Sequence, residues 1–174
     1  MADRDRPSGP RPAGALGLRA NLARISAAEL TGRLAGQGIE TRPDPRSPAA
    51  LIAVGRPRGI TQLAEYHDGL LELQDAGSQW ISDLVPLEPG QALLDYCAGG
   101  GGKTLAVAAR VKGRFHAHDA HPKRMADLPV RAERAGIRVA LCPPGSALPA
   151  TRPRAIAAVT STPWARPGRS CSAA

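Results

Sequence analysis

The stretch LLDYCAGGGGKTLAVAARV, residues 93–111, decides how the rest of the chain is interpreted. An apolar run ends at Asp95, a run of glycines follows at 99–102, and Lys103 then opens a segment whose apolar residues have helical spacing. A continuous apolar run is typical of a strand buried in a parallel sheet, and a glycine-rich turn before a helix is typical of a ligand-binding loop. The stretch therefore predicts a strand, a binding loop and a helix, in that order.

The segments around this stretch repeat the alternation of strands and helices. The elements expected are a helix over 75–87, strands over 91–95, 114–119 and 139–142, a helix over 102–111, and a helix over 122–136 that is interrupted or restarts at Pro129. This order predicts an α/β fold with a Rossmann-like, doubly wound sheet.

A smaller unit precedes that sheet. Ser26 and Glu29 have the spacing of a capping box, ahead of a helix whose one face carries Leu30 and Leu34. Strands are expected over 16–22, 39–41 and 50–54 and, in the region that links the two units, over 69–74. The expected organisation is a disordered tail over 1–14, a small α+β RNA-binding module over 15–60, the N-terminal part of the Rossmann-like domain over 61–140, and an irregular Pro- and Arg-rich tail over 141–174.

The glycine loop does not match the sequence motifs that bind two common classes of ligand, nucleoside triphosphates and dinucleotides. A triphosphate-binding loop requires a glycine five positions before Gly102, where Cys97 stands, and a dinucleotide fingerprint requires a third glycine where Thr104 stands. What remains is a glycine-rich turn at the carboxyl end of a strand, which suits a small adenosyl ligand. Asp119, at the end of the next strand, is placed to accept hydrogen bonds from ribose hydroxyls, or alternatively to cap the helix that follows.

The overall charge is strongly positive. Lys and Arg number 23 against 15 Asp and Glu, a formal net charge of +8. Such a charge favours a polyanionic partner, with nucleic acid the first candidate, and the alternative is an Arg-rich compositional bias. The three cysteines lack metal-site spacing, the histidines at 116, 118 and 121 have mixed spacing, and the N-terminus carries neither a signal peptide nor a membrane span. We therefore expect a cytoplasmic protein without a metal site.

One family resemblance is specific. Residues 94–104, LDYCAGGGGKT, resemble the S-adenosylmethionine motif of the RNA (cytosine-5) methyltransferases of the Rsm/NOP family: an apolar strand, Asp, any residue, Cys-Ala, two small residues and Gly-Gly-Lys-Thr. Gly99-Gly100 stand where that pattern most often has Ala-Pro. The similarity extends to GLLELQDAGSQW (69–80) with its Gln-Asp-x-x-Ser-Gln signature, to HDAHPKRMADLPVRAERAGI (118–137), and to LRANLARISAAELTGRLAGQGIE (18–40).

The resemblance implies an RNA (cytosine-5-)-methyltransferase, which transfers a methyl group from S-adenosylmethionine to C5 of a cytosine in RNA, and ribosomal RNA is the RNA that we expect. The partners that it implies are S-adenosylmethionine and RNA, without a membrane or a metal, and we expect a monomer. The cofactor-binding residues that it implies are Cys97, Ala98, Gly99, Gly100, Gly101, Gly102, Lys103 and Asp119. Alternatively, Lys103 is a structural or RNA-facing cation, and Thr104 caps the helix.

The catalytic part of the family pattern is missing. In that family a cysteine thiolate, carried in a Pro-Cys-Ser-Gly or a Thr-Cys segment, attacks C6 of the cytosine. Here Cys142 follows a leucine and Cys171 follows a serine, so the sequence names no catalytic residue. We expect a truncated, catalytically incomplete fragment, in which the strand that carries Asp95 is an uncovered sheet edge. The alternative function is that of a non-catalytic, basic RNA-binding module.

Overall fold

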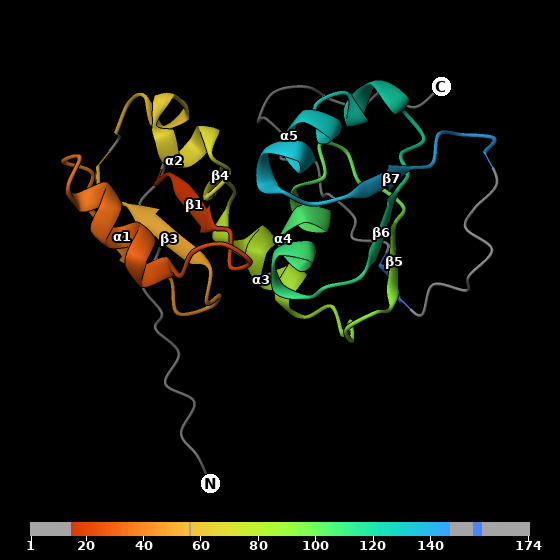
Figure 1. Ribbon diagram of the computed structural model, residues 1–174, viewed down its shortest axis with the longest axis horizontal. Coiled ribbons are helices and arrows are strands. Elements are labelled where there is room, and N and C mark those ends of the chain that lie inside the picture. Colours follow the sequence, from red (N-terminus) through yellow and green to blue (C-terminus); the bar gives the residue numbers. More distant parts are fainter. Residues whose placement is uncertain (1–14, 56, 147–154, 158–174) are drawn as a thin grey trace, which may run out of the picture.

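The computed structural model describes residues 15–55, 57–146 and 155–157, and its elements form two groups that lie side by side (Figure 1). The first group contains β1 (Gly17–Ala20), α1 (Ala27–Ala35), β2 (Thr41–Pro43), β3 (Ala50–Ala53), the 3-10 helix η1 (Ile60–Gln62), α2 (Ala64–His67) and β4 (Leu71–Leu73). The second contains α3 (Ala76–Asp83), β5 (Ala92–Asp95), α4 (Gly102–Arg110), β6 (Arg114–Ala117), the 3-10 helix η2 (Pro122–Met125), α5 (Leu128–Ala135), β7 (Val139–Leu141) and β8 (Ala155–Ala157).

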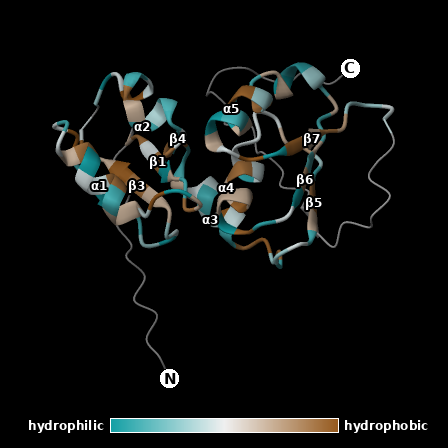
Figure 2. Cartoon of the chain, viewed as in Figure 1, coloured by the Kyte–Doolittle hydropathy of each residue, from teal (hydrophilic) through white to brown (hydrophobic). Residues whose placement is uncertain are grey.

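The first sheet is antiparallel, in the order β2-β3-β1-β4, and α1 packs against it. Leu18 of β1 lies opposite Leu51 of β3 and Leu73 of β4. Leu18, Leu30 and Leu51 are excluded from solvent almost completely. The apolar residues of β3 are visible in Figure 2. Burying each such leucine contributes about 2 kcal/mol, so the apolar face of α1 holds the helix on the sheet.

The local signals of this unit are confirmed in part. Ser26 is the N-cap of α1, and its hydroxyl accepts a hydrogen bond from the Glu29 N–H at 3.1 Å. The Glu29 carboxylate, however, accepts from Arg33 at 2.9 Å, so an i,i+4 ion pair replaces the second bond of the capping box. The strand expected over 39–41 lies at Thr41–Pro43 instead.

The segment expected to link the two units belongs to the first sheet. β4 pairs with β1, with Ala20 opposite Leu71. The sheet therefore extends beyond residue 60, where the sequence pattern places a boundary. Local periodicity does not encode which distant strand a short apolar run will pair with, because the pairing is decided by tertiary packing.

The second sheet is parallel, in the order β7-β6-β5-β8, and it confirms the predicted Rossmann-like α/β fold. The expectation that β5 is an uncovered edge is wrong, since β8 pairs with it and places Leu94 opposite Ile156. This finding also departs from the irregular tail expected over 141–174, of which only 141–146 and 155–157 are described. The tail expected over 1–14 lies outside the described residues.

The helix expected over 122–136 is divided. η2 ends at Met125, and α5 begins at Leu128, with Pro129 in its first turn, where a missing N–H leaves no bond unmade. Gly136 ends α5 with a φ of +70°. Leu105, Ala117, Met125 and Leu128 form the apolar contact between α4, β6 and these helices.

Polar side chains from the first unit reach into the second. Asn21 donates from Nδ2 to the Gly69 carbonyl at 2.9 Å and to the Ala135 carbonyl, at the end of α5, at 3.0 Å. Arg19 donates to the Leu105 carbonyl of α4 at 3.3 Å, and burial lowers the pKa of its guanidinium to about 10, so it remains charged at neutral pH. These contacts fix the two units against each other. Within the described residues, no helix has the length and apolar character to cross a membrane.

Candidate functional site

The glycine loop joins the carboxyl end of β5 to the start of α4. Gly101 is the N-cap of α4 and has a φ of +74°, in the left-handed region. A Cβ at this position would lie 2.1 Å from Leu128 Cδ1, so both the conformation and the close packing require glycine here. Gly99 also has a positive φ, of +50°. The loop is therefore shaped by residues without side chains, which leaves its backbone groups open to a ligand.

Thr104 anchors the helix start to the strand end. Its hydroxyl donates to Asp95 Oδ2 at 2.7 Å, and both side chains are buried. Burial raises the pKa of the Asp95 carboxyl, although the bond from Thr104 and the N–H of Cys97 at 3.3 Å partly oppose this. The expected alternative, that Thr104 caps α4, is wrong because Gly101 holds the cap position.

Asp119 follows β6 and faces the glycine loop. Its Oδ2 accepts from the Gly99 N–H at 3.0 Å, and its Oδ1 accepts from the His121 N–H at 2.9 Å, just before η2. Arg124 Nη1 lies 3.6 Å from Oδ2. Burial acts to raise the pKa of Asp119, but the N–H donors of His121 and Gly99 and the charge of Arg124 together lower it below its usual value. The carboxylate is thus held ionised beside the loop.

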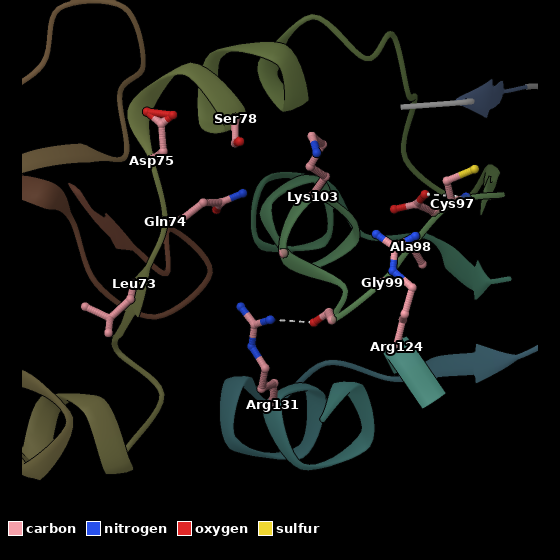
Figure 3. A pocket seen from close by; sticks show the side chains of 13 residues that line it. Leu73, Gln74, Asp75, Ser78, Cys97, Ala98, Gly99, Lys103, Arg124 and Arg131 are labelled. Carbon is pink, nitrogen blue, oxygen red and sulfur yellow. Dashed lines mark hydrogen bonds between the residues drawn. The ribbon is translucent and has the colours of Figure 1, made fainter. Parts of the chain in front are cut away.

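A cavity of about 340 Å³ lies between the glycine loop and the segment that joins β4 to α3 (Figure 3). It is lined by Leu73, Gln74, Asp75, Ser78, Asp95, Cys97, Ala98, Gly99, Gly100, Gly102, Lys103, Arg124 and Arg131. Most of the cofactor-binding residues expected from sequence are therefore brought together. Gly101 and Asp119 are the two that do not line the cavity: Gly101 faces Leu128, and Asp119 lies behind Gly99.

Sequence reasoning missed one wall of this cavity. Gln74, Asp75 and Ser78 come from the first turn of α3 and the residues before it, where Asp75 is the N-cap and accepts from the Gly77 N–H at 3.0 Å. The Gln-Asp-x-x-Ser-Gln signature was the available signal. Gln79, the last residue of that signature, is instead buried and donates to the carbonyls of Leu18 and Gln74, each at 3.0 Å.

The cavity offers charges of both signs. Lys103, Arg124 and Arg131 contribute cations, and Asp75 and Asp95 contribute carboxylates. No sequence motif indicated that Arg124 and Arg131 would line the cavity, because arginine is abundant throughout the chain. Cys97 is the cysteine in the lining, and no histidine stands beside it there as a base. The arrangement suits the binding of a polar small molecule that carries charges of both signs.

His116 and His118 do not line the cavity, and their surroundings are those of residues that support the fold. His118 is buried, its Nδ1 lies 2.7 Å from the Cys142 carbonyl, and its ring packs against that of Tyr96 at 4.4 Å between centroids. Burial lowers the pKa of His116, so its imidazole is neutral at pH 7. Over the residues that the structure describes, no group of three or more His, Cys, Asp or Glu side chains is arranged to hold a metal ion.

Comparison with curated proteins identifies relatives of one kind. The chain is 32% identical over 124 residues to the "Probable ribosomal RNA small subunit methyltransferase B" of Synechocystis, covering 70% of this chain and 28% of that protein. It is 38% identical over 90 residues to ribosomal RNA small subunit methyltransferase B of Pasteurella multocida, covering 52% of this chain and 20% of that protein. The chain thus spans less than a third of the length of these relatives. No protein-family model matches it.

Solved structures show the same fold. A methyltransferase homolog protein from Pyrococcus horikoshii matches with a TM-score of 0.68 and 27% identity, over 74% of this chain and 43% of that one. NSun6 from the same organism, solved with SFG, matches with a TM-score of 0.67 at 15% identity, over 74% of this chain and 57% of that one, which concerns the fold alone. Together with the motif of residues 94–104, these relatives confirm the predicted resemblance to the Rsm/NOP family: over the matched segments, the chain is similar to ribosomal RNA small subunit methyltransferase B proteins.

Proposed function

We propose that this chain is the S-adenosylmethionine-binding part of a methyltransferase that acts on C5 of cytosine in ribosomal RNA. The observation that carries the proposal is the cavity at the glycine loop, whose size falls within the range of small-molecule sites. S-adenosylmethionine combines a carboxylate, an ammonium group and a sulfonium ion, and the cavity lining combines cations with carboxylates. SFG, the compound present in the NSun6 structure, is an analogue of this cofactor.

The backbone of the loop would hold the methionine part of the cofactor. Gly99, Gly100 and Gly102 line the cavity without side chains, and the N-terminus of α4, which begins at Gly102, favours negative charge. Lys103 adds a cation on the same helix turn. We assign to these groups the binding of the carboxylate end of the cofactor.

Asp119 would hold the ribose. Its lowered pKa keeps the carboxylate ionised, as an acceptor for hydroxyl groups should be. In the structure Asp119 is buried behind Gly99 and does not line the cavity, so contact with a ribose requires the loop at Gly99 to move aside. Glycine at position 99 permits that movement, because its backbone is free to change φ without a steric penalty.

Methyl transfer itself also requires a cysteine nucleophile, which could not be identified from the sequence. S-adenosylmethionine, when bound, supplies the methyl group. Cys97 lies in the cofactor cavity, and Cys142 is buried beside His118, so neither is presented to a base. We therefore propose cofactor binding without turnover for the residues that the structure describes.

The test is a calorimetric titration of the full chain with S-adenosylmethionine, with ATP as the matched control. We expect binding of the methyl donor and none of ATP, since Cys97 replaces the first glycine that a triphosphate loop needs. Equal binding of ATP, or binding of neither compound by folded protein, would contradict the proposal.

The charge of +8 favours a second candidate, a basic RNA-binding module without a cofactor. This candidate predicts RNA affinity that falls steeply with salt and does not change when S-adenosylmethionine is added. Filter binding of a ribosomal RNA fragment at several salt concentrations, with and without the cofactor, separates the two functions.

A further inference from the structure

Arg131 connects the first unit of the chain to the glycine loop. It stands on α5, and its Nη2 lies 2.9 Å from Glu72 Oε2, on β4. Its Nη1 donates to the Gly100 carbonyl at 2.5 Å, and Figure 3 shows this side chain directed at the loop. One guanidinium therefore contacts both a carboxylate of the antiparallel sheet and the backbone that lines the cofactor cavity.

The Glu72 carboxylate, which binds Arg131, is buried. Only 5% of its side chain is exposed, and its other oxygen accepts a hydrogen bond from Arg134. Arg134 stacks over the Tyr66 ring at 3.8 Å and does not line the cavity. Glu72 thus holds two arginines, of which one reaches the loop and the other does not.

Gly100 leaves the space that the Arg131 head group occupies. A Cβ at position 100 would lie 2.9 Å from Arg131 Nη1, which is closer than real Cβ contacts. Any side chain here would push the guanidinium away from the Gly100 carbonyl. The residue type at position 100 and the place of Arg131 are therefore linked.

We propose that Arg131 is the positioning residue of the cofactor loop and that Glu72 fixes Arg131, so that affinity for S-adenosylmethionine depends on a carboxylate of the antiparallel sheet; this rests on the function proposed above. Hydrogen bonds to charged groups are the strong ones in proteins, and the forked guanidinium can serve two acceptors in one plane. Without Arg131 the Gly100 carbonyl loses its donor, and the loop loses its fixed orientation.

The two arginines that share Glu72 form a matched pair of test sites. Arg131→Lys keeps the charge but cannot serve both acceptors with the same geometry, so affinity for S-adenosylmethionine should fall about tenfold in calorimetry. Arg134→Lys should change the affinity less than twofold, although it also weakens a bond to Glu72. Glu72→Gln should reduce affinity as Arg131→Lys does. Losses of affinity that merely follow the loss of thermal stability in all three variants would overturn the proposal.

A compensating pair separates positioning from general stability. Gly100→Ala alone displaces the flexible Arg131 head group and should reduce affinity, with little loss of stability. In Arg131→Ala the space for the added methyl group is open, so adding Gly100→Ala should cost much less affinity than it does in the parent chain. A cost that is the same in both backgrounds would show that the two positions are independent, against the proposal.

A second measurement does not depend on the cofactor. Amide hydrogen exchange of the peptide that contains residues 97–103, in ligand-free protein, should be faster in Arg131→Lys and unchanged in Arg134→Lys. If the parent chain binds no S-adenosylmethionine, the proposed function fails, and the exchange of this peptide still decides whether Arg131 orders the loop. Equal exchange in the parent chain and in Arg131→Lys would refute that role.

Discussion

The hydroxyl of Thr104 donates to the carboxylate of Asp95 at 2.7 Å, and this bond joins the first turn of α4 to the last residue of β5. Thr104 is excluded from solvent, and Asp95 is only 3% exposed. The glycine loop begins at one of these residues and ends at the other. Their bond therefore fixes the distance that the loop must span.

Replacing Thr104 by the similarly shaped valine should destabilise the protein by about 1–3 kcal/mol, because a buried carboxylate oxygen would lose its donor. The measurement is the free energy of unfolding in urea. Thr41→Val is the control: its hydroxyl makes a 3.3 Å contact with that of Thr31 at a partly buried position, and we expect a change of about 0.5 kcal/mol or less. Similar losses in the two variants would contradict the role given to Thr104.

The lowered pKa of Asp119 predicts a dependence of stability on pH. A carboxyl whose pKa is lower in the folded than in the unfolded state contributes stability above its unfolded value, and this contribution is lost as the pH falls through the folded pKa. The stability advantage of the parent chain over Asp119→Asn should be constant from pH 7 to 5 and shrink below about pH 4. Urea titrations at a series of pH values measure it, and an advantage that grows toward low pH would be inconsistent with this.

The contribution of Asp95 to stability should depend on pH with the opposite sign. Burial raises its pKa in the folded state, so the folded protein takes up a proton before the unfolded chain does as the pH falls. Relative to Asp95→Asn, the parent chain should therefore gain stability as the pH is lowered from its raised pKa toward about 4. The same urea series measures this difference, and parallel curves for the two proteins would argue that Asp95 has an ordinary pKa.

Asn21 provides a test of the contact between the two units. Its amide nitrogen donates to two carbonyls, of Gly69 and Ala135, and the residue is 3% exposed. Asn21→Asp would place an acceptor opposite both acceptors, so it should destabilise the protein more than Asn21→Ala, which should cost about 2 kcal/mol. Urea unfolding at pH 7 compares the two variants, and an aspartate variant as stable as the alanine variant would mean that these bonds contribute little.

Gly102 offers a mild way to block the cavity. A Cβ there would lie 3.5 Å from Gln74 Nε2, an ordinary contact, so Gly102→Ala should fold normally and place a methyl group in the cavity. We expect its affinity for S-adenosylmethionine to fall about tenfold or more. Gly32→Ala, at an open and exposed position of α1, is the matched control and should bind as the parent does. Unchanged affinity in Gly102→Ala would show that the cofactor does not contact this wall of the cavity.

Signals contained within a few residues were sufficient to predict much of the fold. Ser26 caps α1, and the apolar run before Asp95 forms a strand of a parallel sheet, as their local patterns indicate. These features depend on backbone preferences and on periodicity, both of which are visible in one sequence. The pairing of β4 with β1, and that of β8 with β5, depends on contacts between distant segments, which local patterns do not specify.

The same limit applies to the candidate site. The glycine loop could be found because its chemistry lies in consecutive residues, whereas Arg131 and Glu72 meet only after both units have folded. The sequence does not predict the orientation of the Asp119 side chain either. That orientation depends on the N–H groups of Gly99 and His121, which donate hydrogen bonds to its carboxylate.

The buried polar contacts between the two units have a consequence for how the chain denatures. If either unit opened alone, Arg19 and Glu72 would lose partners in the other unit, and Asn21 would lose the Ala135 carbonyl. Half-open forms would exchange these bonds for hydrogen bonds to water, which costs the net contribution of each bond, about 1 kcal/mol or somewhat more where a charged group takes part. The chain should melt in one cooperative transition, with the calorimetric and van't Hoff enthalpies equal, as a single thermodynamic unit rather than as two domains on a linker.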